Sequence, residues 1–554
     1  MSEASPPAST RRSPIPDVPH ATPIPTERRL TVPGAARAQR RVASDRERLF
    51  DLAVIAIPFS LAAVLAFYEI TTRSLWLDEA ASVAIASQHG VALWHAMEHD
   101  GGNMLAYYAL LHGVIGLFGD STLVIRFASA LATAATVGIV AFLARTLFDR
   151  RVAFAAGLLT AVSLTLVYWG QDARSYALMM AFVVASYLSF VALVDAGHGR
   201  SEAGAPPARW AWLAYVVTTV LAAYMSFEAV LIVPAQLLSL VWLRGRPLRS
   251  VISAVAVAGA CCLPLLVLAE RRGSSQLFWV PKPNFTQLHQ MLEALLSAGL
   301  QPNFHLTGTA TALLLLTGVL VLGCIGAIAR VRRATWPQML VLSWLLVPVA
   351  LSLLESVLVQ PITLSRAALV SLPAASLLLA WGAMDRRVPR LLGVTSVGVI
   401  LMLRALQLTP SYGASPENWH AATAHVLAAA RPGDCIAFFP SDGRQAFSYY
   451  IGTRTPAATR APRSVLPAVP WSEVKPFVER YTSPSTSALS RIEATCPRLW
   501  FISSHRGQKN GPSASRSDYA RYQALLGSLT RGYPRRRAVS YGWASPVRVD
   551  LFSR

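Results

Sequence analysis

Apolar stretches of about 20 residues recur through most of this chain, separated by short polar segments rich in arginine. In lipid the backbone must satisfy its own hydrogen bonds, so such stretches predict transmembrane helices. The stretch 210–243 is too long for one helix, and we divide it near Tyr224–Glu228. About eleven spans are expected, at residues 49–70, 122–147, 152–169, 176–195, 210–243 (two spans), 250–269, 308–328, 338–358, 367–384 and 391–408.

One further apolar segment, Asn103–Phe118, is short for a span. If it crosses the membrane, the arginine-rich segment 145–151 falls outside the cell. If it lies in the membrane interface, the arginine-rich loops 145–151, 244–249, 330–333 and 385–390 all fall on one side. Cytoplasmic loops collect lysine and arginine, so we favour the interfacial helix, which places the C-terminus outside.

The N-terminal residues 1–48 are rich in proline, serine, alanine and arginine and contain almost no aromatic side chains. This composition predicts a disordered tail, and its excess of arginine over acidic residues favours the cytoplasm. The stretch is too long and too poor in apolar residues to be a signal peptide. The transmembrane module is therefore expected at residues 49–409.

The pattern changes at residues 410–554, which predict a small α/β domain on the extracytoplasmic side. A helix is expected from Ser415-Pro416 to about Ala430, and another at 518–530. Strands are expected at 435–439, 499–503 and 547–552, the last closing the sheet. Cys435 and Cys496 lie beside these strands. Outside the cell they can form a disulfide, with two free thiols as the alternative.

The composition is 53% hydrophobic with a formal net charge of +21. Such a charge is typical of nucleic-acid binding, but arginines in cytoplasmic loops and in one basic domain account for it here. The sequence contains no P-loop, no glycine-rich dinucleotide motif and no histidine or cysteine spacing typical of a metal site. We therefore expect no nucleic-acid partner, no nucleotide and no dedicated metal site. The need for a divalent ion stays open.

The polar residues of greatest interest follow the first span, in the first outer loop, residues 71–121. Asp78 and Glu79 are adjacent carboxylates just past the membrane, beside Trp76. Charges there are costly unless they face water, a cavity or a partner. The predicted topology brings further charged residues to the same level, namely Glu69, Asp100, Arg126, Asp172, Arg174, Glu228, Arg271, Arg272, Lys282, Glu355, Arg366 and Arg404.

Acids and arginines gathered at one membrane face suit transfer from an anionic lipid carrier. A carboxylate can remove the proton from an acceptor hydroxyl as a general base. Arginines can hold and neutralise a phosphate leaving group with paired hydrogen bonds. An apolar cleft between helices can take a polyprenyl tail. The simpler interpretation is that each charge is solvated or paired locally, and for Arg271, Arg272 and Lys282 we prefer binding to anionic lipid headgroups.

Several motifs resemble the GT-C glycosyltransferases, in the branch related to protein O-mannosyltransferases and the lipid A aminoarabinose transferase. Ser74–Ala80 (SLWLDEA) resembles the first-loop Asp-Glu motif of that family. The resemblance continues in the same order through Tyr107–His112, Leu117–Asp120, Arg126–Ala130, Tyr168–Tyr176, Pro361–Arg366, Glu417–His420 and Arg431–Asp434. It covers about residues 48–554, and the last two segments resemble the outer domain of actinobacterial members.

The resemblance implies a polyprenyl-phosphate sugar donor and inversion at the anomeric carbon. It implies that Asp78 is the base with Glu79 beside it, and that Asp100 is the second acid of the first outer loop. Arg174 and Arg366 are the expected phosphate ligands. The matched motifs add Arg126, Asp172 and Tyr176 to the expected substrate-binding residues. The sequence departs from the family pattern at Asn103–Ala106, where Pro-Pro-Leu is usual, and at Ala367, where tyrosine is usual.

An arginine- and alanine-rich, lysine-poor composition suits a bacterium of high genomic GC content, so mannose or arabinose on decaprenyl phosphate is the expected donor. The acceptor is expected to be a hydroxyl of a cell-envelope glycan, lipid or protein. Two other classes stay open. A transporter or flippase predicts inverted repeats and broken helices at the membrane midplane. A non-catalytic membrane anchor for the outer domain predicts that Asp78 can become asparagine without loss of function.

Overall fold

The computed structural model describes residues 33–197, 208–243, 245, 247–272, 280–300, 306–330, 334–452, 461–473, 484–511 and 513–554. The chain divides into two units, residues 1–50 and 51–554. Helix α1 (Pro33–Phe67) begins in the first unit and ends in the second. All residues discussed below for their chemistry belong to the second unit.

The tail predicted to be disordered is helical over part of its length. Residues 33–48 form the beginning of α1. Proline at the first helical position and the following run of alanine and arginine, which are strong helix formers, explain this difference. Residues 1–32 lie outside the described residues, so disorder there stays a prediction.

Each of the eleven predicted spans coincides with a helical segment. Eight of these are long and apolar enough to cross a membrane among the residues that the structure describes, and a bent pair makes a ninth. After α1 they are α5 (Thr122–Leu147), the pair α6 (Arg150–Ala161) and α7 (Leu164–Gly170), α8 (Tyr176–Gly197), α11 (Leu248–Arg272), α13 (Thr307–Arg330), α14 (Trp336–Leu358), η4 (Ser365–Ser371) with α15 (Leu372–Met384), and α16 (Arg390–Gly413).

The remaining two predicted spans are shorter or less apolar. They are α9 (Ala208–Met225) and a composite of η1 (Phe227–Leu231), α10 (Ile232–Ser239) and η2 (Leu240–Trp242). The break between α9 and η1 falls at Ser226, inside the segment where the long apolar run was divided. The protein is therefore a multi-pass helical membrane protein.

The predicted span 152–169 corresponds to two helices, α6 and α7, with a bend of 57° between them. Ser163 begins the second segment, and its hydroxyl accepts the N–H of Leu166. The break releases backbone carbonyls that need new donors. The Arg404 guanidinium donates to the carbonyls of Leu159 and Leu296, so this buried charge stabilises the bend. Arg404 therefore does not join the charged cluster expected at the outer face.

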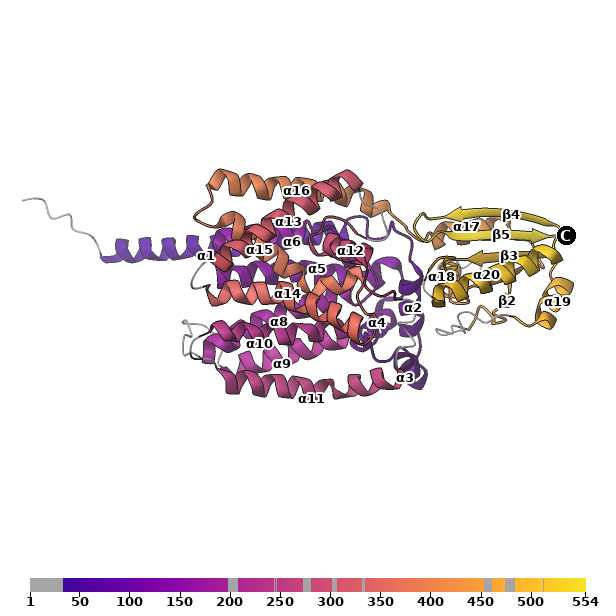
Figure 1. Ribbon diagram of the computed structural model, residues 1–554, viewed down its shortest axis with the longest axis horizontal. Coiled ribbons are helices and arrows are strands. Elements are labelled where there is room, and N and C mark those ends of the chain that lie inside the picture. Colours follow the sequence, from indigo (N-terminus) through magenta and orange to yellow (C-terminus); the bar gives the residue numbers. More distant parts are fainter. Residues whose placement is uncertain are drawn as a thin grey trace, which may run out of the picture. The chain divides into compact units, whose positions relative to one another are not determined.

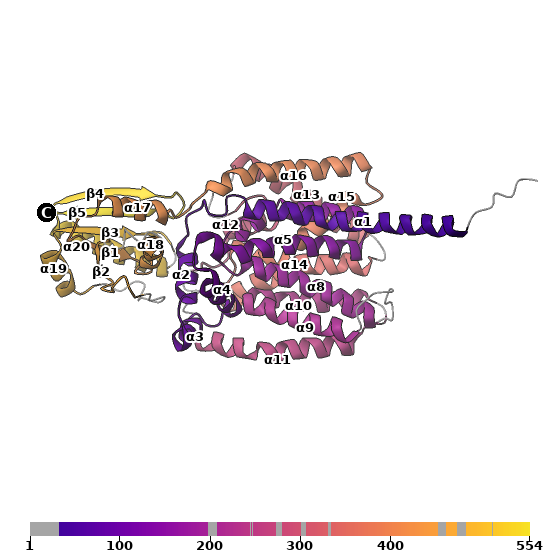
Figure 2. The ribbon, with the colours of Figure 1, turned by 180° about the vertical axis from the view of Figure 1, so that it is seen from behind.

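Three short helices of the segment predicted to be the first outer loop lie together at one end of the bundle, as Figures 1 and 2 show. They are α2 (Leu77–Ala86), α3 (Gly90–His99) and α4 (Leu105–Phe118). With 14 residues, α4 is shorter than a span requires. A further short helix, α12 (Phe285–Leu295), begins at the capping residue Asn284. Elsewhere Asp51 Oδ1 binds the Nε atoms of Arg145 and Arg150, each at 2.7 Å.

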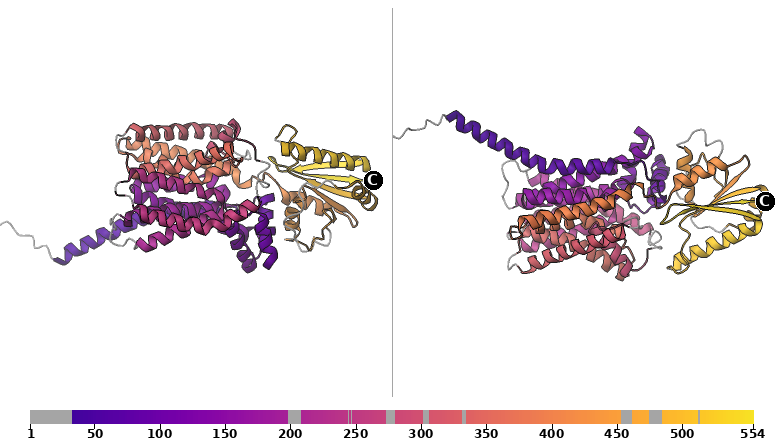
Figure 3. Two further views of the ribbon diagram at one scale, coloured as in Figure 1. Left: turned by 60° about the horizontal axis from the view of Figure 1, so that its bottom comes forward. Right: turned by 90° about the horizontal axis from the view of Figure 1, so that it is seen from above.

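The C-terminal domain contains a five-stranded sheet in the order β2-β1-β3-β5-β4. Strands β2 (Arg463–Leu466), β1 (Cys435–Phe439) and β3 (Arg498–Ser503) are parallel, whereas β5 (Val547–Ser553) and β4 (Arg535–Tyr541) add antiparallel. Figure 3 shows helices on both faces of the sheet. The helices are α17 (Trp419–Ala429), α18 (Gly443–Gly452), α19 (Thr486–Thr495) and α20 (Ser513–Gly532). One face packs on α17 and α18, the other on α19 and α20.

The structure corrects several details predicted for this domain. Helix α17 begins at Trp419 and is capped by Asn418, so Ser415-Pro416 does not open it. Ser415 Oγ instead accepts the N–H of Ser74, 3.0 Å away. The predicted last strand is present as β5, which pairs with β3 on one side and with the unpredicted β4 on the other. The sequence missed β4 because all but its last residue are exposed, and most are polar. The short β2 was also missed.

Cys435 and Cys496 are joined by a disulfide in the structure, with their Cα atoms 5.7 Å apart. The bridge connects the first residue of β1 to the segment between α19 and β3. Both cysteines are fully buried in the core cluster on that face of the sheet. The pairing is the one that the sequence left open as an alternative to free thiols.

Candidate functional site

Asp78 and Glu79, although adjacent, lie in different environments at the start of α2. Consecutive residues of a helix do not face the same direction. The Glu79 side chain is 1% exposed, whereas that of Asp78 is 29% exposed and lines a cavity. Of the two carboxylates, only that of Asp78 can therefore contact a substrate in this cavity.

Glu79 forms a buried ion pair with Arg126 of α5. Arg126 Nε donates to Glu79 Oε1 at 2.8 Å, and a terminal nitrogen donates to Oε2 at 2.7 Å. The N–H of Ala173 also donates to Oε1, at 2.8 Å. Burial would raise the pKa of Glu79, but the charge and hydrogen bonds of Arg126 outweigh burial and lower it. Glu79 is therefore an ionised structural group that fixes α2 to α5.

Asp172 lies in the turn between α7 and α8 and is also buried. Its Oδ1 accepts the indole N–H of Trp76 at 2.9 Å. Burial and the neighbouring Glu79 charge raise the pKa of Asp172 well above its usual value. Glu79, Arg126 and Asp172 do not line the cavity, so the expectation that they touch substrate gives way to a positioning role.

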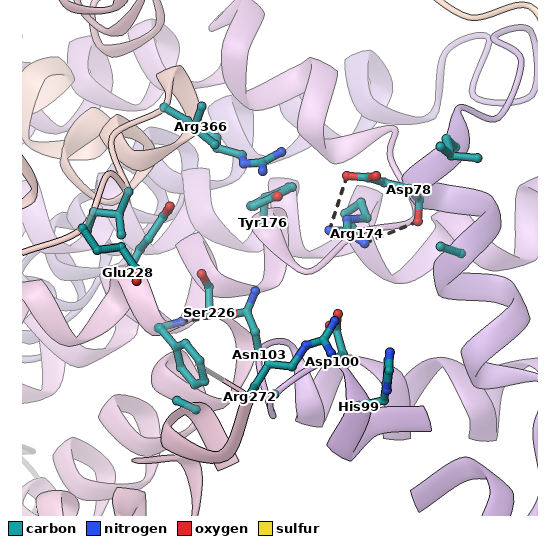
Figure 4. Close-up of a pocket in the computed structure, with 18 of the residues that line it drawn as sticks. Asp78, His99, Asp100, Asn103, Arg174, Tyr176, Ser226, Glu228, Arg272 and Arg366 are labelled. Atoms are coloured by element: carbon teal, nitrogen blue, oxygen red, sulfur yellow. Dashed lines mark hydrogen bonds and ion pairs between the residues drawn. The ribbon is translucent and has the colours of Figure 1, made fainter. Parts of the chain in front are cut away.

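Arg174 stands beside Asp78 on the cavity wall (Figure 4). Its guanidinium approaches Asp78 Oδ2 at 3.6 Å and donates to the Asp78 carbonyl at 3.3 Å and to Ser82 Oγ at 3.1 Å. Burial by itself would lower the pKa of Arg174, but Asp78, with smaller contributions from Tyr176, Tyr108 and Asp100, outweighs burial and raises it. Arg174 therefore places a permanent cation beside the half-buried carboxylate of Asp78.

A second arginine completes the cationic wall. The guanidinium carbons of Arg366 and Arg174 lie 5.8 Å and 5.9 Å from the ring centre of Tyr176. Figure 4 shows the three side chains on the same side of the cavity as Asp78. This arrangement, which the sequence could not establish, brings together residues 174, 176 and 366 from segments almost 200 residues apart.

Serine and threonine hydroxyl groups stabilise the turn that precedes η4, the helix that carries Arg366. Ser356 Oγ accepts the N–H groups of Ile362 and Thr363 at 2.9 Å and 2.8 Å. Thr363 Oγ1 lies 2.6 Å from Ser356 Oγ and donates to the Ser352 carbonyl at 3.0 Å. These contacts fold the chain back between α14 and η4. They are a positioning device that the sequence analysis missed, since serine and threonine in an apolar run carry no distinctive signal.

Asp100 lies across the cavity from the arginine pair, at the end of α3 (Figure 4). Its Oδ2 accepts the hydroxyl of Tyr108 at 2.8 Å. Gly101 and Gly102 follow with φ angles of +73° and +76°. A Cβ at Gly101 would lie 2.9 Å from Arg272 Cβ, so glycine permits this loop to pack directly on α11.

The cavity has a volume of about 1780 Å³ and two kinds of wall. Its polar part contains Asp78, Asp100, Arg174, Tyr176 and Arg366. An apolar part lies between η1, α11 and the end of α14, lined by Val230, Leu263, Leu266, Val359 and Ile362. The cavity thus joins a polar chamber to an apolar groove among membrane helices.

Comparison with known proteins agrees with this architecture. The crystal structure of ArnT from Cupriavidus metallidurans bound to undecaprenyl phosphate matches with a TM-score of 0.51 at 14% identity, over 90% of this chain and 98% of that one. The apo structure of the same protein matches with a TM-score of 0.54 at 14% identity, over 89% and 97%. The protein has the GT-C glycosyltransferase fold.

Two further comparisons also found similar proteins. Residues 103–268 match the family model of dolichyl-phosphate-mannose-protein mannosyltransferase, a stretch that runs from α4 to α11. An oligosaccharyltransferase from Archaeoglobus fulgidus, tethered to an acceptor peptide, matches with a TM-score of 0.49 at 13% identity, over 90% of this chain and 73% of that one. No curated protein matches the chain in sequence.

Buried hydrogen bonds connect the C-terminal domain to the helix that carries Asp78. Glu417 is 3% exposed, and its Oε2 accepts the N–H of Leu77 at 3.1 Å and the indole N–H of Trp419 at 2.8 Å. Its Oε1 lies 3.2 Å from His505 Nε2. The Tyr450 hydroxyl accepts the N–H of Leu75 at 2.7 Å. Sequence reasoning assigned Glu417 no role, because only the fold brings it to α2.

Within the described ranges, no three histidine, cysteine, aspartate or glutamate side chains are grouped so as to hold a metal ion. The cationic groups on the cavity wall are guanidinium groups, which can themselves neutralise an anion. The arrangement can therefore bind a phosphate and present a carboxylate to a hydroxyl group within one cavity.

Proposed function

We propose that the protein transfers a sugar from a polyprenyl-phosphate donor to a hydroxyl group of a cell-envelope acceptor. The acceptor hydroxyl attacks the anomeric carbon, the bond from that carbon to the phosphate oxygen breaks, and the configuration inverts. The observation that carries the proposal is that one cavity brings together the accessible carboxylate of Asp78, the guanidinium groups of Arg174 and Arg366, and an apolar groove.

Asp78 is proposed as the general base that takes the hydroxyl proton. It is the exposed member of the Asp78-Glu79 pair and stands on the first turn of a helix that buried contacts hold at both faces. Arg174 orients the carboxylate through the ion pair between the two side chains. A base must lie within hydrogen-bond reach of the proton it removes, and the cavity in front of Asp78 has room for a sugar hydroxyl.

Arg174 and Arg366 are proposed to hold the donor phosphate, which becomes the leaving group. The flat face of Tyr176 lies near both guanidinium groups and limits where each can point. Two planar cations aimed at one phosphate neutralise the charge that grows as the bond to the sugar breaks. Asp100, supported by Tyr108, is proposed to bind hydroxyl groups of the reacting sugars.

The apolar groove between η1, α11 and α14 is proposed to hold the polyprenyl chain. Binding of the prenyl groups in such a groove is favourable by about 25 cal/mol for each Å² of apolar surface that leaves water. Mannose and arabinose are the proposed sugars. The site and the C-terminal domain are proposed to lie outside the cytoplasm, because this topology gathers the arginine-rich loops on the cytoplasmic side.

The test compares wild type with Asp78→Asn, each purified in detergent and given radiolabelled polyprenyl-phosphate mannose or arabinose with an envelope lipid extract. Asp120→Asn is the matched control, because Asp120 is an exposed acid of the same outer region that does not line the cavity. Loss of the base should lower the rate about 100- to 10,000-fold, with the control near wild type.

The other outcomes separate the remaining classes of protein. Equal turnover by wild type and Asp78→Asn would retain the transferase and remove Asp78 from the mechanism. If the donor is not cleaved and the intact lipid moves between the leaflets of a vesicle, the protein would be a transporter. Donor that neither binds nor reacts would favour a membrane anchor for the C-terminal domain.

A further inference from the structure

The C-terminal domain has a crevice where its strand order reverses. From β1 the chain passes through α18 to β2 on one side, then returns through α19 to β3 on the other side of β1. Strands β1 and β3 are parallel neighbours, so their carboxyl ends lie together. In open α/β sheets, ligands bind in the crevice at the carboxyl ends of strands beside such a reversal.

The segments that leave these two strand ends are the ones that line the large cavity. Asp442 and Gln445 follow β1, and His505, Arg506 and Gln508 follow β3. Asp442 and Gln445 are each 6% exposed, so their polar groups are built into the wall and do not extend into bulk solvent. The topological position and the cavity lining thus identify the same place from separate observations.

The backbone of this crevice is closely packed. The N–H of Ser504 donates to the carbonyl of Phe439 at 3.0 Å, which joins the two segments. His505 has a φ angle of +42°, a left-handed conformation that is uncommon outside glycine. Gly507, with φ +74°, packs so closely on α20 that a Cβ would lie 2.2 Å from the Ser515 carbonyl oxygen. Such conformations persist where the surrounding structure fixes them, and they cluster at ligand sites.

The chemistry of the wall indicates the class of ligand. Carboxylates accept hydrogen bonds, guanidinium groups donate them, and amide side chains do both, so together they match the hydroxyl groups of a sugar. Among the described residues, this wall also contains Pro440, Gly507, Ser515, Asp518, Ala544, Ser545 and Pro546. Apart from the imidazole of His505, none of the described wall residues has an aromatic or large aliphatic side chain, which a peptide would need to seat its own apolar groups.

We infer that this crevice, at the carboxyl ends of β1 and β3, binds the acceptor and that the acceptor is a glycan chain. The inference rests on the proposed transferase function and extends it to the acceptor. The crevice and Asp78 line one continuous cavity, so a bound glycan can place a hydroxyl before the base. His505 contacts Glu417, which in turn binds the N–H of Leu77, the residue before Asp78.

The experiment measures binding of neutral linear mannose and arabinose oligosaccharides to the full-length protein in detergent, by saturation-transfer NMR. Asp442→Asn and Gln508→Ala alter the crevice, and each should weaken binding about tenfold, the effect of one lost hydrogen bond of about 1.4 kcal/mol. Gln508 is exposed, so its substitution tests the site without disturbing the core. Arg537→Gln is the control, an exposed residue of β4 outside the cavity that should bind as wild type does.

Unchanged affinity in both crevice variants, or no oligosaccharide binding by wild type, would overturn the inference. Binding of a serine- and threonine-rich peptide in place of the oligosaccharides would also overturn it, because the acceptor would then be a protein. Donor cleavage is measured in parallel. Cleavage without oligosaccharide binding rejects the crevice and leaves the transferase, whereas crevice-dependent binding without cleavage of any donor rejects the transferase and leaves a glycan-binding domain.

Discussion

Replacing Glu417 tests whether the C-terminal domain positions the catalytic helix. Glu417→Ala leaves two donors without their acceptor, the N–H of Leu77 and the indole N–H of Trp419. Both residues are buried, at 4% and 0% exposure, so water cannot readily replace the carboxylate. Each stranded donor costs about 1–3 kcal/mol, and the two together about 2–6 kcal/mol of stability. The first turn of α2, which carries Asp78, should shift as a result.

The expected kinetic result is a kcat about 100-fold below wild type, because small misplacement of a reacting group has effects of that size, while KM for the donor changes little. Glu417→Gln keeps one carbonyl oxygen as acceptor and should lose less. Trp419→Phe is the matched control, since it removes one donor and leaves the contact between Glu417 and Leu77 in place. The assays are donor turnover and thermal unfolding followed by tryptophan fluorescence.

The pH dependence gives a second measurement on the same residue. Burial raises the pKa of Glu417 above its usual value, more than the neighbouring His505 lowers it. Protonated Glu417 is therefore favoured by the folded state, and its contribution to stability is full at low pH and is lost as pH rises through the raised pKa. Glu417→Gln should remove this slope. Unfolding temperature and kcat equal to wild type in Glu417→Ala would refute the positioning role.

Three further predictions concern other parts of the molecule. Glu79→Gln removes the charge that pairs with the buried Arg126, and should lower the free energy of unfolding by about 3–5 kcal/mol. The expected signs are a lower yield of monodisperse protein and a lower unfolding temperature. An unchanged unfolding temperature would contradict the structural role of Glu79. Arg366→Gln should weaken donor binding about 10- to 100-fold, by the loss of a charged hydrogen bond of about 1.5–3 kcal/mol, and an unaltered donor KM would remove Arg366 from the phosphate site. Cys435 and Cys496 are 61 residues apart in the sequence, so reducing their disulfide should destabilise the C-terminal domain by about 4 kcal/mol. Treating Cys435→Ser with the same reductant is the control, because any change seen there does not come from this bond.

Much of the membrane architecture could be read from the order of residues. A span must be apolar for about 20 residues whatever its neighbours are, so the periodic apolar runs located eleven helical segments. The pattern could not reveal the bend between α6 and α7, since it depends on Arg404 from another helix supplying donors to the released carbonyls. The strand β4 was missed for a related reason, because it pairs at an exposed edge and carries no apolar pattern of its own.

For the site, the sequence predicted that Asp78, Arg174 and Arg366 lie at one level, and the structure places all three on one cavity wall. Only the family resemblance favoured Asp78 over Glu79 as the base, because two adjacent carboxylates look alike until a helix turns one toward Arg126 and the other toward the cavity. The sequence could not assign Glu417, which reaches α2 from about 340 residues away. Local propensity and hydrophobic pattern act within the chain, whereas burial, charge pairing and cavity lining depend on residues that only the tertiary structure brings together.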